Sequence, residues 1–189
     1  MRRMPDAMAA TPLQEPLALL REIEHRCGQS AAGLPSQVET KAEWMGVGFR
    51  LGQARLVAPL GEVLEILTYP GQTTRVPGAR SWVKGIANVR GNLLPIMDLQ
   101  ACLNGRPTEL NPGSRVLVVS HKGVFAGLLV DEVLGLKHFQ EEQRTPDLPL
   151  LDASVTPYLK RAYHDGDEHW GVFSLYKLAE SQLFLQAAG

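Results

Sequence analysis

The sequence has little cysteine, no excess of one charge and no long apolar run, and each shortage excludes a class of protein. Its two cysteines, Cys27 and Cys102, lie far apart and form no Cys-x-x-Cys pair, which predicts free thiols in a reducing compartment. The 19 basic and 20 acidic residues leave a net charge of -1, too balanced for nucleic-acid binding held mainly by charge. The apolar stretches are too short to span a bilayer, and Pro5 and Asp6 interrupt what could be a signal peptide. We therefore expect a cytoplasmic protein.

The sequence carries none of the glycine-rich or nucleophile motifs that point to an enzyme. It has no Gly-x-x-x-x-Gly-Lys-Ser/Thr phosphate loop and no Gly-x-Ser-x-Gly elbow. The glycines of residues 46–52 lie inside a strand-like alternation and lack the spacing of a dinucleotide site. His25, His121 and His138 are isolated, which favours ordinary surface or core roles. We expect no catalytic residue and no cofactor.

One segment, His164 to His169, concentrates two imidazoles and three carboxylates, a donor set that could bind a divalent metal. Its Asp165-Gly166 pair is flanked by strand-like residues and is typical of a hairpin turn, whose polar side chains are solvated. We favour the turn and expect no metal. The alternative, a metal protein or enzyme built on His164 and His169, predicts stoichiometric metal in the purified protein.

Residues 1–42 differ from the rest of the chain because four prolines interrupt them. Between the prolines, about residues 13–27 have the spacing of one amphipathic helix. Its apolar face carries Leu13, Leu17, Leu20 and Ile23. A helix of this length is marginal alone, so the face must dock either on its own domain or on a partner. The residues leave both alternatives open.

From Trp44 onward the apolar period changes from 3.6 to 2, which predicts β-strands separated by close turns. The expected strands are 47–51, 55–60, 63–67, 83–89, 93–99, 115–119, 124–130, 133–136 and 170–175. Many short strands favour a sandwich or barrel over a βαβ fold. A break at 105–113 lies near the middle of this region and suggests two small barrels. Helical spacing returns over residues 176–189.

Two positions in the strand region carry particular expectations. Pro59 removes a backbone donor, so its strand should lie at a sheet edge or contain a bulge. Gly91 permits a sharp turn, and Arg90 beside it should project from the rim of the sheet. Arg90 either binds a partner or pairs with the protein's own Asp98 or Glu65, and the residues leave these alternatives open. We expect Asp98 to cap or orient backbone at a strand end.

These runs together resemble the CheW-like domain, the coupling module of bacterial chemosensory signalling. Residues 47–52 resemble its opening strand, and residues 63–66 resemble its Val-x-Glu-Ile segment. Residues 83–99 closely resemble the family signature hKGhxNhRGxhhPhhDL, in which h is apolar. The remaining matches follow in the family's order at 116–119, 127–133 and 170–178. The resemblance covers about residues 44–183.

The resemblance implies an all-β fold with flanking helices, built as two interlocked five-stranded SH3-like β-barrels. It implies an N-terminal extension over residues 1–42, with the helix at about 13–27, and a CheW-like domain over residues 43–185 made of two barrel subdomains. A C-terminal helix completes the fold. The family has no catalytic activity, and the resemblance implies neither cofactor nor metal.

The resemblance also implies partners: a methyl-accepting chemoreceptor and a chemosensory histidine kinase, without nucleic acid or direct membrane insertion. In the family, one face of the first barrel pairs edge to edge with a kinase domain, and a groove between the barrels takes the receptor's helical tip. The residues carried over to partner binding are Val63, Glu65, Asn88, Arg90, Gly91, Val130 and Asp131. Val63 and Glu65 are implied to lie near a partner surface, and Asn88, Arg90 and Gly91 near the receptor. Val130 and Asp131 are implied to line the groove or to brace it.

The chain departs from the family pattern in two strands. Residues 56–60 lack the tyrosine and acidic residue often found there, and residues 158–163 lack a frequent glycine. These departures and the long leading segment resemble the CheW-type proteins of type IV pilus chemosensory systems, which act in twitching motility. The implied location is the cytoplasm, with recruitment to membrane receptor arrays at the cell pole.

A second interpretation is a CheW-like regulatory subunit that binds the kinase without a receptor. In that case the helix at 13–27 would cover the receptor groove. Removal of residues 1–42 distinguishes the two interpretations, because stronger receptor binding after truncation supports a covering helix. Unchanged binding makes the extension a tether or a passive tail.

Overall fold

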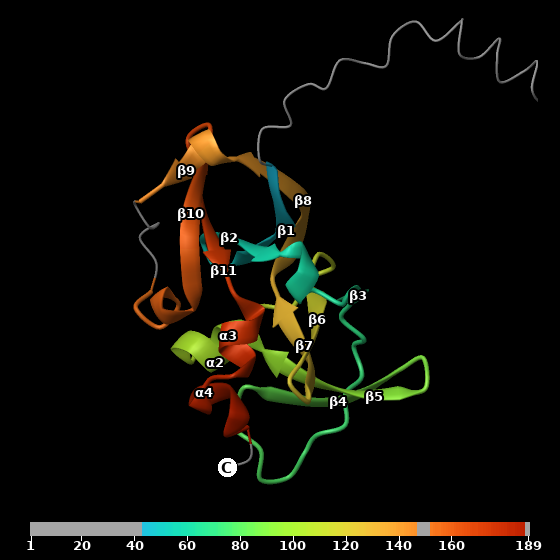
Figure 1. The fold of residues 1–189 in the computed structure, drawn as a ribbon. Helices are drawn as coiled ribbons and strands as arrows, with labels where there is room; N and C mark the ends of the chain where they lie inside the picture. Colours follow the sequence, from blue (N-terminus) through green and yellow to red (C-terminus); the bar gives the residue numbers. More distant parts are fainter. Residues whose placement is uncertain (1–42, 147–151, 188–189) are drawn as a thin grey trace, which may run out of the picture. The chain divides into compact units, whose positions relative to one another are not determined.

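Two curled β-sheets form the bulk of residues 43–146 and 152–187, the part of the chain that the computed structural model describes (Figure 1). The first sheet has six strands in the order β8 (Glu132–Gln140), β1 (Glu43–Leu51), β2 (Ala54–Pro59), β11 (Glu168–Phe173), β10 (Leu159–Asp165) and β9 (Arg144–Thr145). The second has five, in the order β3 (Glu65–Thr68), β6 (Arg115–His121), β7 (Val124–Val130), β5 (Asn92–Asp98) and β4 (Val83–Val89). The predicted all-β fold is confirmed. The sixth strand of the first sheet, which we did not expect, is the two-residue β9 on the outer edge of β10.

The two sheets are interlocked along the chain. The first sheet takes β1 and β2 from the beginning of the domain and β8 to β11 from its end, while β3 to β7 form the second sheet. A short parallel pairing of β2 with β11, at Leu56 and Val57, joins these two groups of strands into one sheet. The break at 105–113, expected to separate the barrels, instead lies within the second sheet, between β5 and β6. Sequence spacing could not reveal this, because pairings such as β1 with β8 and β5 with β7 join strands that are not neighbours in the chain.

The expectation for Pro59 is wrong. Its strand β2 lies between β1 and β11, and the β1–β2 ladder runs without a bulge from Leu51 to Gly46. Proline is tolerated there because it is the last residue of β2, beyond the positions that pair with β11. A missing backbone donor costs little where the second neighbour has already ended.

Short helices fill the corners between strands. They are η1 (Leu60–Glu62), α2 (Leu99–Asn104), η2 (Glu141–Gln143), η3 (Thr156–Tyr158), α3 (Leu175–Ala179) and α4 (Gln182–Leu185). Asp98 caps α2 as expected, since its Oδ1 accepts a hydrogen bond from the Ala101 N–H at 3.0 Å. The helical spacing over 176–189 corresponds to two short helices, because Ser181 begins a new one. The helix predicted at 13–27 lies outside the described residues.

Buried apolar side chains form three clusters. A large cluster lies between the two sheets and includes Val47, Phe49, Leu117 and Leu128. Smaller clusters fill the inside of each curl. The five-stranded sheet encloses Ala87, Leu94, Ile96, Val116, Val118 and Leu129. The six-stranded sheet encloses Val57, Phe139, Tyr163, Trp170 and Val172, with stacked rings of Phe139 and Tyr163. Each curl therefore has its own interior, and the sheets share a third.

One buried carboxylate connects the crossover helix η1 to the first sheet and to the start of α3. Glu62 in η1, 6% exposed, lies in the crossover from β2 to β3. It accepts hydrogen bonds from Lys160 Nζ at 2.7 Å, from Ser174 Oγ and from the Tyr176 N–H at 3.1 Å. Lys160 belongs to β10, and Ser174 is the N-cap of α3. A single side chain thus holds three segments together: η1, β10 and the start of α3.

Candidate partner-binding site

The turn between β4 and β5 presents Arg90 at the tip of a two-residue hairpin. Arg90 and Gly91 both have positive φ, 52° and 86°, as the tight turns that join twisted strands require. The Asn88 Oδ1 accepts a hydrogen bond from the Gly91 N–H at 2.9 Å and holds the turn closed. A left-handed arginine costs on the order of 1–2 kcal/mol. Asn88 and Gly91 therefore shape the turn, and Arg90 is the member of the three that extends from it.

Arg90 forms an ion pair with Glu65 across the opening of the second sheet. The Arg90 Nη1 and Glu65 Oε1 atoms are 2.7 Å apart, and the side chains are 76% and 36% exposed. Glu65 lies on β3 and Arg90 follows β4, the two edge strands of this sheet. Of the two candidate internal partners, the structure selects Glu65, because the Asp98 oxygens bind Ala101 and Thr108. The pair orients the guanidinium while leaving most of it accessible.

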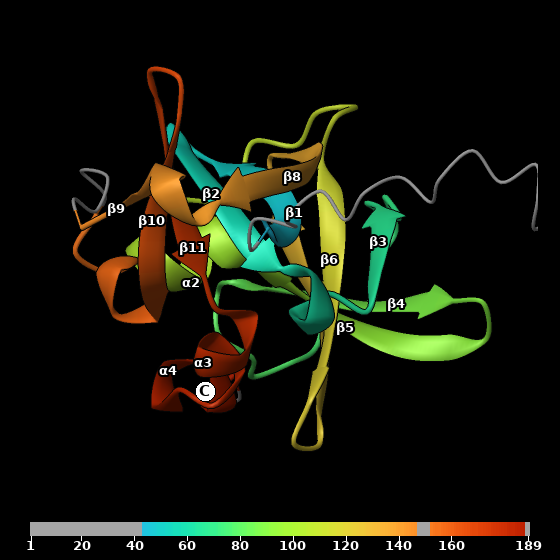
Figure 2. The same ribbon diagram turned by 45° about the horizontal axis from the view of Figure 1, so that its top comes forward.

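Beneath the ion pair lies a shallow hollow of about 120 Å³. Its floor is the interior of the five-stranded sheet, where Leu94 and Val118 are buried. Its rim carries exposed apolar side chains, Leu64 at 65% and Phe125 at 41%. Figure 2 shows β3 beside the projecting β4–β5 hairpin. The barrel mouth, defined here by Glu65, Arg90 and this hollow, combines accessible charge with apolar surface.

The remaining predicted residues lie behind the surface. Val63 follows η1 and packs partly buried against the core between the sheets. Val130 is fully buried in that core. Asp131 is 6% exposed, and its Oδ2 accepts a hydrogen bond from the Gly52 N–H at 2.6 Å, which ties the end of β7 to the β1–β2 turn. Of the roles implied for Val130 and Asp131, bracing fits their burial and direct contact does not.

A second exposed surface, which the residue-by-residue reading missed, follows the border between the sheets. Leu136 on β8 is opposite Val47 on β1, and Ile66 on β3 is opposite Leu117 on β6. Opposite residues share a face, and Val47 and Leu117 belong to the core between the sheets. That core therefore continues outward into exposed apolar side chains. They are Met45, Leu60, Ile66 and Leu136, each at least 42% exposed.

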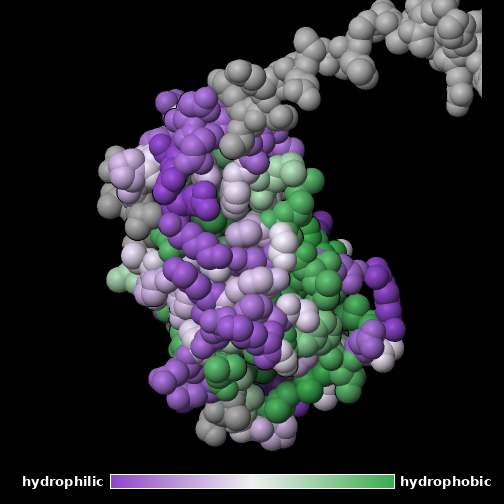
Figure 3. All heavy atoms as spheres, in the orientation of Figure 1, coloured by the Kyte–Doolittle hydropathy of each residue, from purple (hydrophilic) through white to green (hydrophobic). Residues whose placement is uncertain are grey.

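Figure 3 shows this surface, the inter-sheet apolar face, as part of a hydrophobic band along the right side of the molecule, from β8 down past β6 and β3. Such a band of exposed large apolar side chains is typical of a protein interaction site. The alternation of Met45, Val47 and Phe49 in the sequence is a signal for this face. Alternation shows that the three side chains share one side of the strand, but not that Met45 is exposed while Val47 and Phe49 are buried.

The other candidate groups do not join this site. The predicted hairpin at Asp165-Gly166 is confirmed, and His164 lies opposite His169 with ring centroids 4.1 Å apart. Within residues 43–146 and 152–187, no group of three or more His, Cys, Asp or Glu is arranged to hold a metal ion. Cys102 is a free, buried thiol whose pKa is raised to about 12, mainly by burial. Cys27 lies outside the described residues.

The described residues offer a second molecule two surfaces and accessible strand edges, which is the arrangement of a β-barrel interaction module. The chain belongs to the CheW-like family: the family described as CheW-like domain matches residues 45–182. The resemblance identified from the sequence motifs is thereby confirmed. In the described part of the chain, no helix is both long enough and apolar enough to cross a membrane.

Individual relatives extend the match over most of the chain. Protein PilI of Pseudomonas aeruginosa is 48% identical over 176 residues, which covers 93% of this chain and 98% of that protein. Chemotaxis protein CheW of Helicobacter pylori is 30% identical over 114 residues, 60% of this chain and 68% of that protein. The crystal structure of the scaffolding protein TtCheW from Thermoanaerobacter tengcongensis aligns with a TM-score of 0.62 at 24% identity. That alignment covers 74% of this chain and 94% of that one, and it supports the fold.

Proposed function

We propose that this protein is a non-catalytic adaptor that couples a methyl-accepting chemoreceptor to a chemosensory histidine kinase. Its domain, residues 43–185, would act in the cytoplasm at membrane receptor arrays at the cell pole. The pilus branch of these systems is the one we favour. Two observations favour this branch. They are the departures of residues 56–60 and 158–163 from the general family pattern, and the 48% identity to PilI over nearly the whole of both chains.

The observation that carries the proposal is the separation of two chemically different surfaces. The inter-sheet apolar face, with Leu136 58% and Ile66 42% exposed, has the character of a groove for an amphipathic helix. We assign it to the helical tip of the receptor. Its position agrees with the groove between barrels that the family resemblance implies.

The barrel mouth is suited to a different partner. It lies beside β3, an edge strand of the five-stranded sheet whose outer side pairs with no other strand among the described residues, and a free strand edge favours pairing with another β-sheet. We therefore assign Arg90 and Glu65 to the kinase's β-rich domain, and not to the receptor as the resemblance implied. The charges of Arg90 and Glu65 would set the register and orientation in which the kinase domain docks, as charges at the rim of an interface do.

Two single substitutions separate the assignments. Arg90→Glu places two like charges beside each other at the mouth and should remove the kinase while keeping the receptor. Leu136→Glu puts a charge on the inter-sheet apolar face and should remove the receptor while keeping the kinase. Because Arg90 is 76% exposed, its replacement should leave the fold intact. The measurement is retention of each partner from native cytoplasm and membranes by the tagged full-length chain.

A charge swap is the matched control for the mouth. Arg90→Glu combined with Glu65→Arg rebuilds the ion pair with reversed polarity, so recovery of kinase binding means that the pair acts by holding the turn. Arg106→Glu, at an exposed arginine outside both surfaces, should change neither partner. Loss of both partners on either single substitution would contradict two separate surfaces. Retention of the kinase alone by the wild-type chain would favour the regulatory-subunit interpretation.

A further inference from the structure

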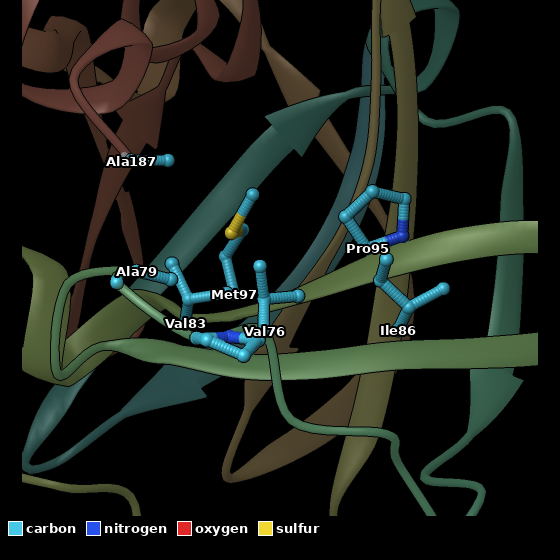
Figure 4. A pocket seen from close by; sticks show the side chains of 9 residues that line it. Val76, Ala79, Val83, Ile86, Pro95, Met97 and Ala187 are labelled. Carbon is cyan, nitrogen blue, oxygen red and sulfur yellow. The ribbon is translucent and has the colours of Figure 1, made fainter. Parts of the chain in front are cut away.

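The outer side of the β4–β5 hairpin carries another hollow, apart from both proposed partner surfaces. It has a volume of about 260 Å³ and an almost wholly apolar lining. Figure 4 shows Val76 and Ala79 of the preceding loop and Ile86, Pro95 and Met97 of the hairpin around it. Ala187, beyond α4, also lines it. We call this the hairpin hollow.

The loop that walls the hairpin hollow is fastened at both ends. Thr74 and Ile86 exchange two backbone hydrogen bonds of 2.8 Å. The Arg80 N–H donates to the Ala187 carbonyl oxygen at 3.0 Å, and the Val83 N–H donates to the Arg80 carbonyl oxygen at 2.9 Å. The wall is therefore part of the folded structure, so a ligand would not have to order it before binding.

The surroundings of the hollow are basic. From residue 66 to residue 89 the chain has three basic residues and no acidic one, although its net charge is -1. Two of the three, Arg75 and Arg80, are exposed and line a neighbouring hollow of about 310 Å³ that shares the wall residues 76–79. Among the described residues, neither guanidinium has a salt-bridge partner, and no acidic residue lines either hollow.

We propose that the hairpin hollow binds a short acidic segment of a partner protein, whose bulky apolar side chain enters the hollow while its carboxylates face Arg75 and Arg80. The volume lies below the roughly 300–1,000 Å³ of small-molecule sites and the lining lacks their convergent polar groups. A flat bilayer would meet protruding side chains better than a concavity. Charge complementarity supplies orientation and association rate, and the apolar side chain supplies burial.

The test uses the full-length chain and fluorescein-labelled synthetic peptides, followed by fluorescence anisotropy. The probe peptide carries a central Leu-Phe pair flanked by glutamates. One comparison peptide replaces the pair by alanines, and another replaces the glutamates by lysines. We expect the probe to bind, and each comparison peptide to bind weaker by about tenfold or more.

Variants of the protein locate the binding. Arg75→Glu with Arg80→Glu should weaken probe binding by about tenfold or more, and Ala79→Leu, which fills the hollow, should weaken it without changing charge. Arg106→Glu is the matched control and should bind as the wild type does. Equal binding of all three peptides, or an equal loss with Arg106→Glu, overturns the proposal. So does capture of the protein by phosphatidylserine vesicles through the same two arginines.

Discussion

Removal of the buried Glu62 carboxylate should destabilise the whole domain rather than one corner of it. Glu62 accepts hydrogen bonds from Lys160, from Ser174 and from the Tyr176 N–H. In Glu62→Ala these groups lose their acceptor together. Since they belong to β10 and to the start of α3, the substitution loosens the contact between the first sheet and the C-terminal helices.

The magnitude follows from burial. Loss of one partner of a buried ion pair costs about 3–5 kcal/mol, and a buried donor without an acceptor costs about 1–3 kcal/mol. Lys160 is 37% exposed, so water can solvate its ammonium group in the variant. We therefore expect about 3 kcal/mol for Glu62→Ala. Glu62→Gln keeps one acceptor oxygen and the side-chain volume, and should cost about 1–2 kcal/mol.

Urea unfolding of the full-length chain, followed by circular dichroism, measures this directly. With a urea dependence of about 1–3 kcal/mol per molar, the Glu62→Ala midpoint should fall by roughly 1–3 M. Glu65→Ala is the matched control, because its ion pair with Arg90 is exposed and worth at most about 1 kcal/mol. If Glu62→Ala shifts the midpoint no more than Glu65→Ala does, the carboxylate is not the connection we describe.

Three further predictions concern single groups. Gly85→Ala, at φ 132° with a Cβ that would collide with the Thr74 carbonyl oxygen, should cost roughly 1–3 kcal/mol in the same unfolding assay, and an unchanged midpoint would contradict it. Burial raises the pKa of Cys102 from 9.0 to about 12, so stability should fall as pH rises from 9.0 through about 12. With the other cysteine replaced by serine, Cys102 should react with Ellman's reagent no faster than the domain unfolds, and rapid labelling would refute burial. The hydrogen bond from the Lys122 ammonium lowers the pKa of Glu180 below 4.5. The ionised Glu180 therefore stabilises the fold above pH 4.5, and this stabilisation is lost as pH falls through the lowered pKa. Acid unfolding of the wild type and of Glu180→Gln should show their difference in stability vanish over that range.

Turns were predictable from the sequence because their chemistry is local. The tight connections at Gly52-Gln53, Arg90-Gly91 and Gly166-Asp167 lie where glycine permits a positive φ. The pairing of the strands was not predictable in the same way. Nothing near Leu56 indicates that β2 has a parallel neighbour in β11, because that contact depends on the return of a segment more than one hundred residues later.

The same difference between local and long-range contacts decides which parts of the candidate site could be predicted from the sequence. Glu65 was named, beside Asp98, as a possible internal partner of Arg90, and the structure pairs Arg90 with Glu65. The inter-sheet apolar face was missed, since a residue such as Leu136 looks the same in sequence whether its sheet face is covered or open. Glu62 was missed for a related reason: three acceptor contacts to distant segments leave no trace in the residues beside it.

The interlocked order of the strands also constrains how the domain is made. During synthesis β1 emerges early, but Phe49 pairs with Val133 of β8, which leaves the ribosome roughly 4–17 s later at ordinary rates of elongation. Meanwhile β3 to β7 can complete the second sheet among themselves. Until then, nascent β1 and β2 can pair only with each other, and this apolar hairpin stays accessible to chaperones and to other nascent chains. A stop codon before β8 would consequently leave the first sheet unbuilt and the second one whole.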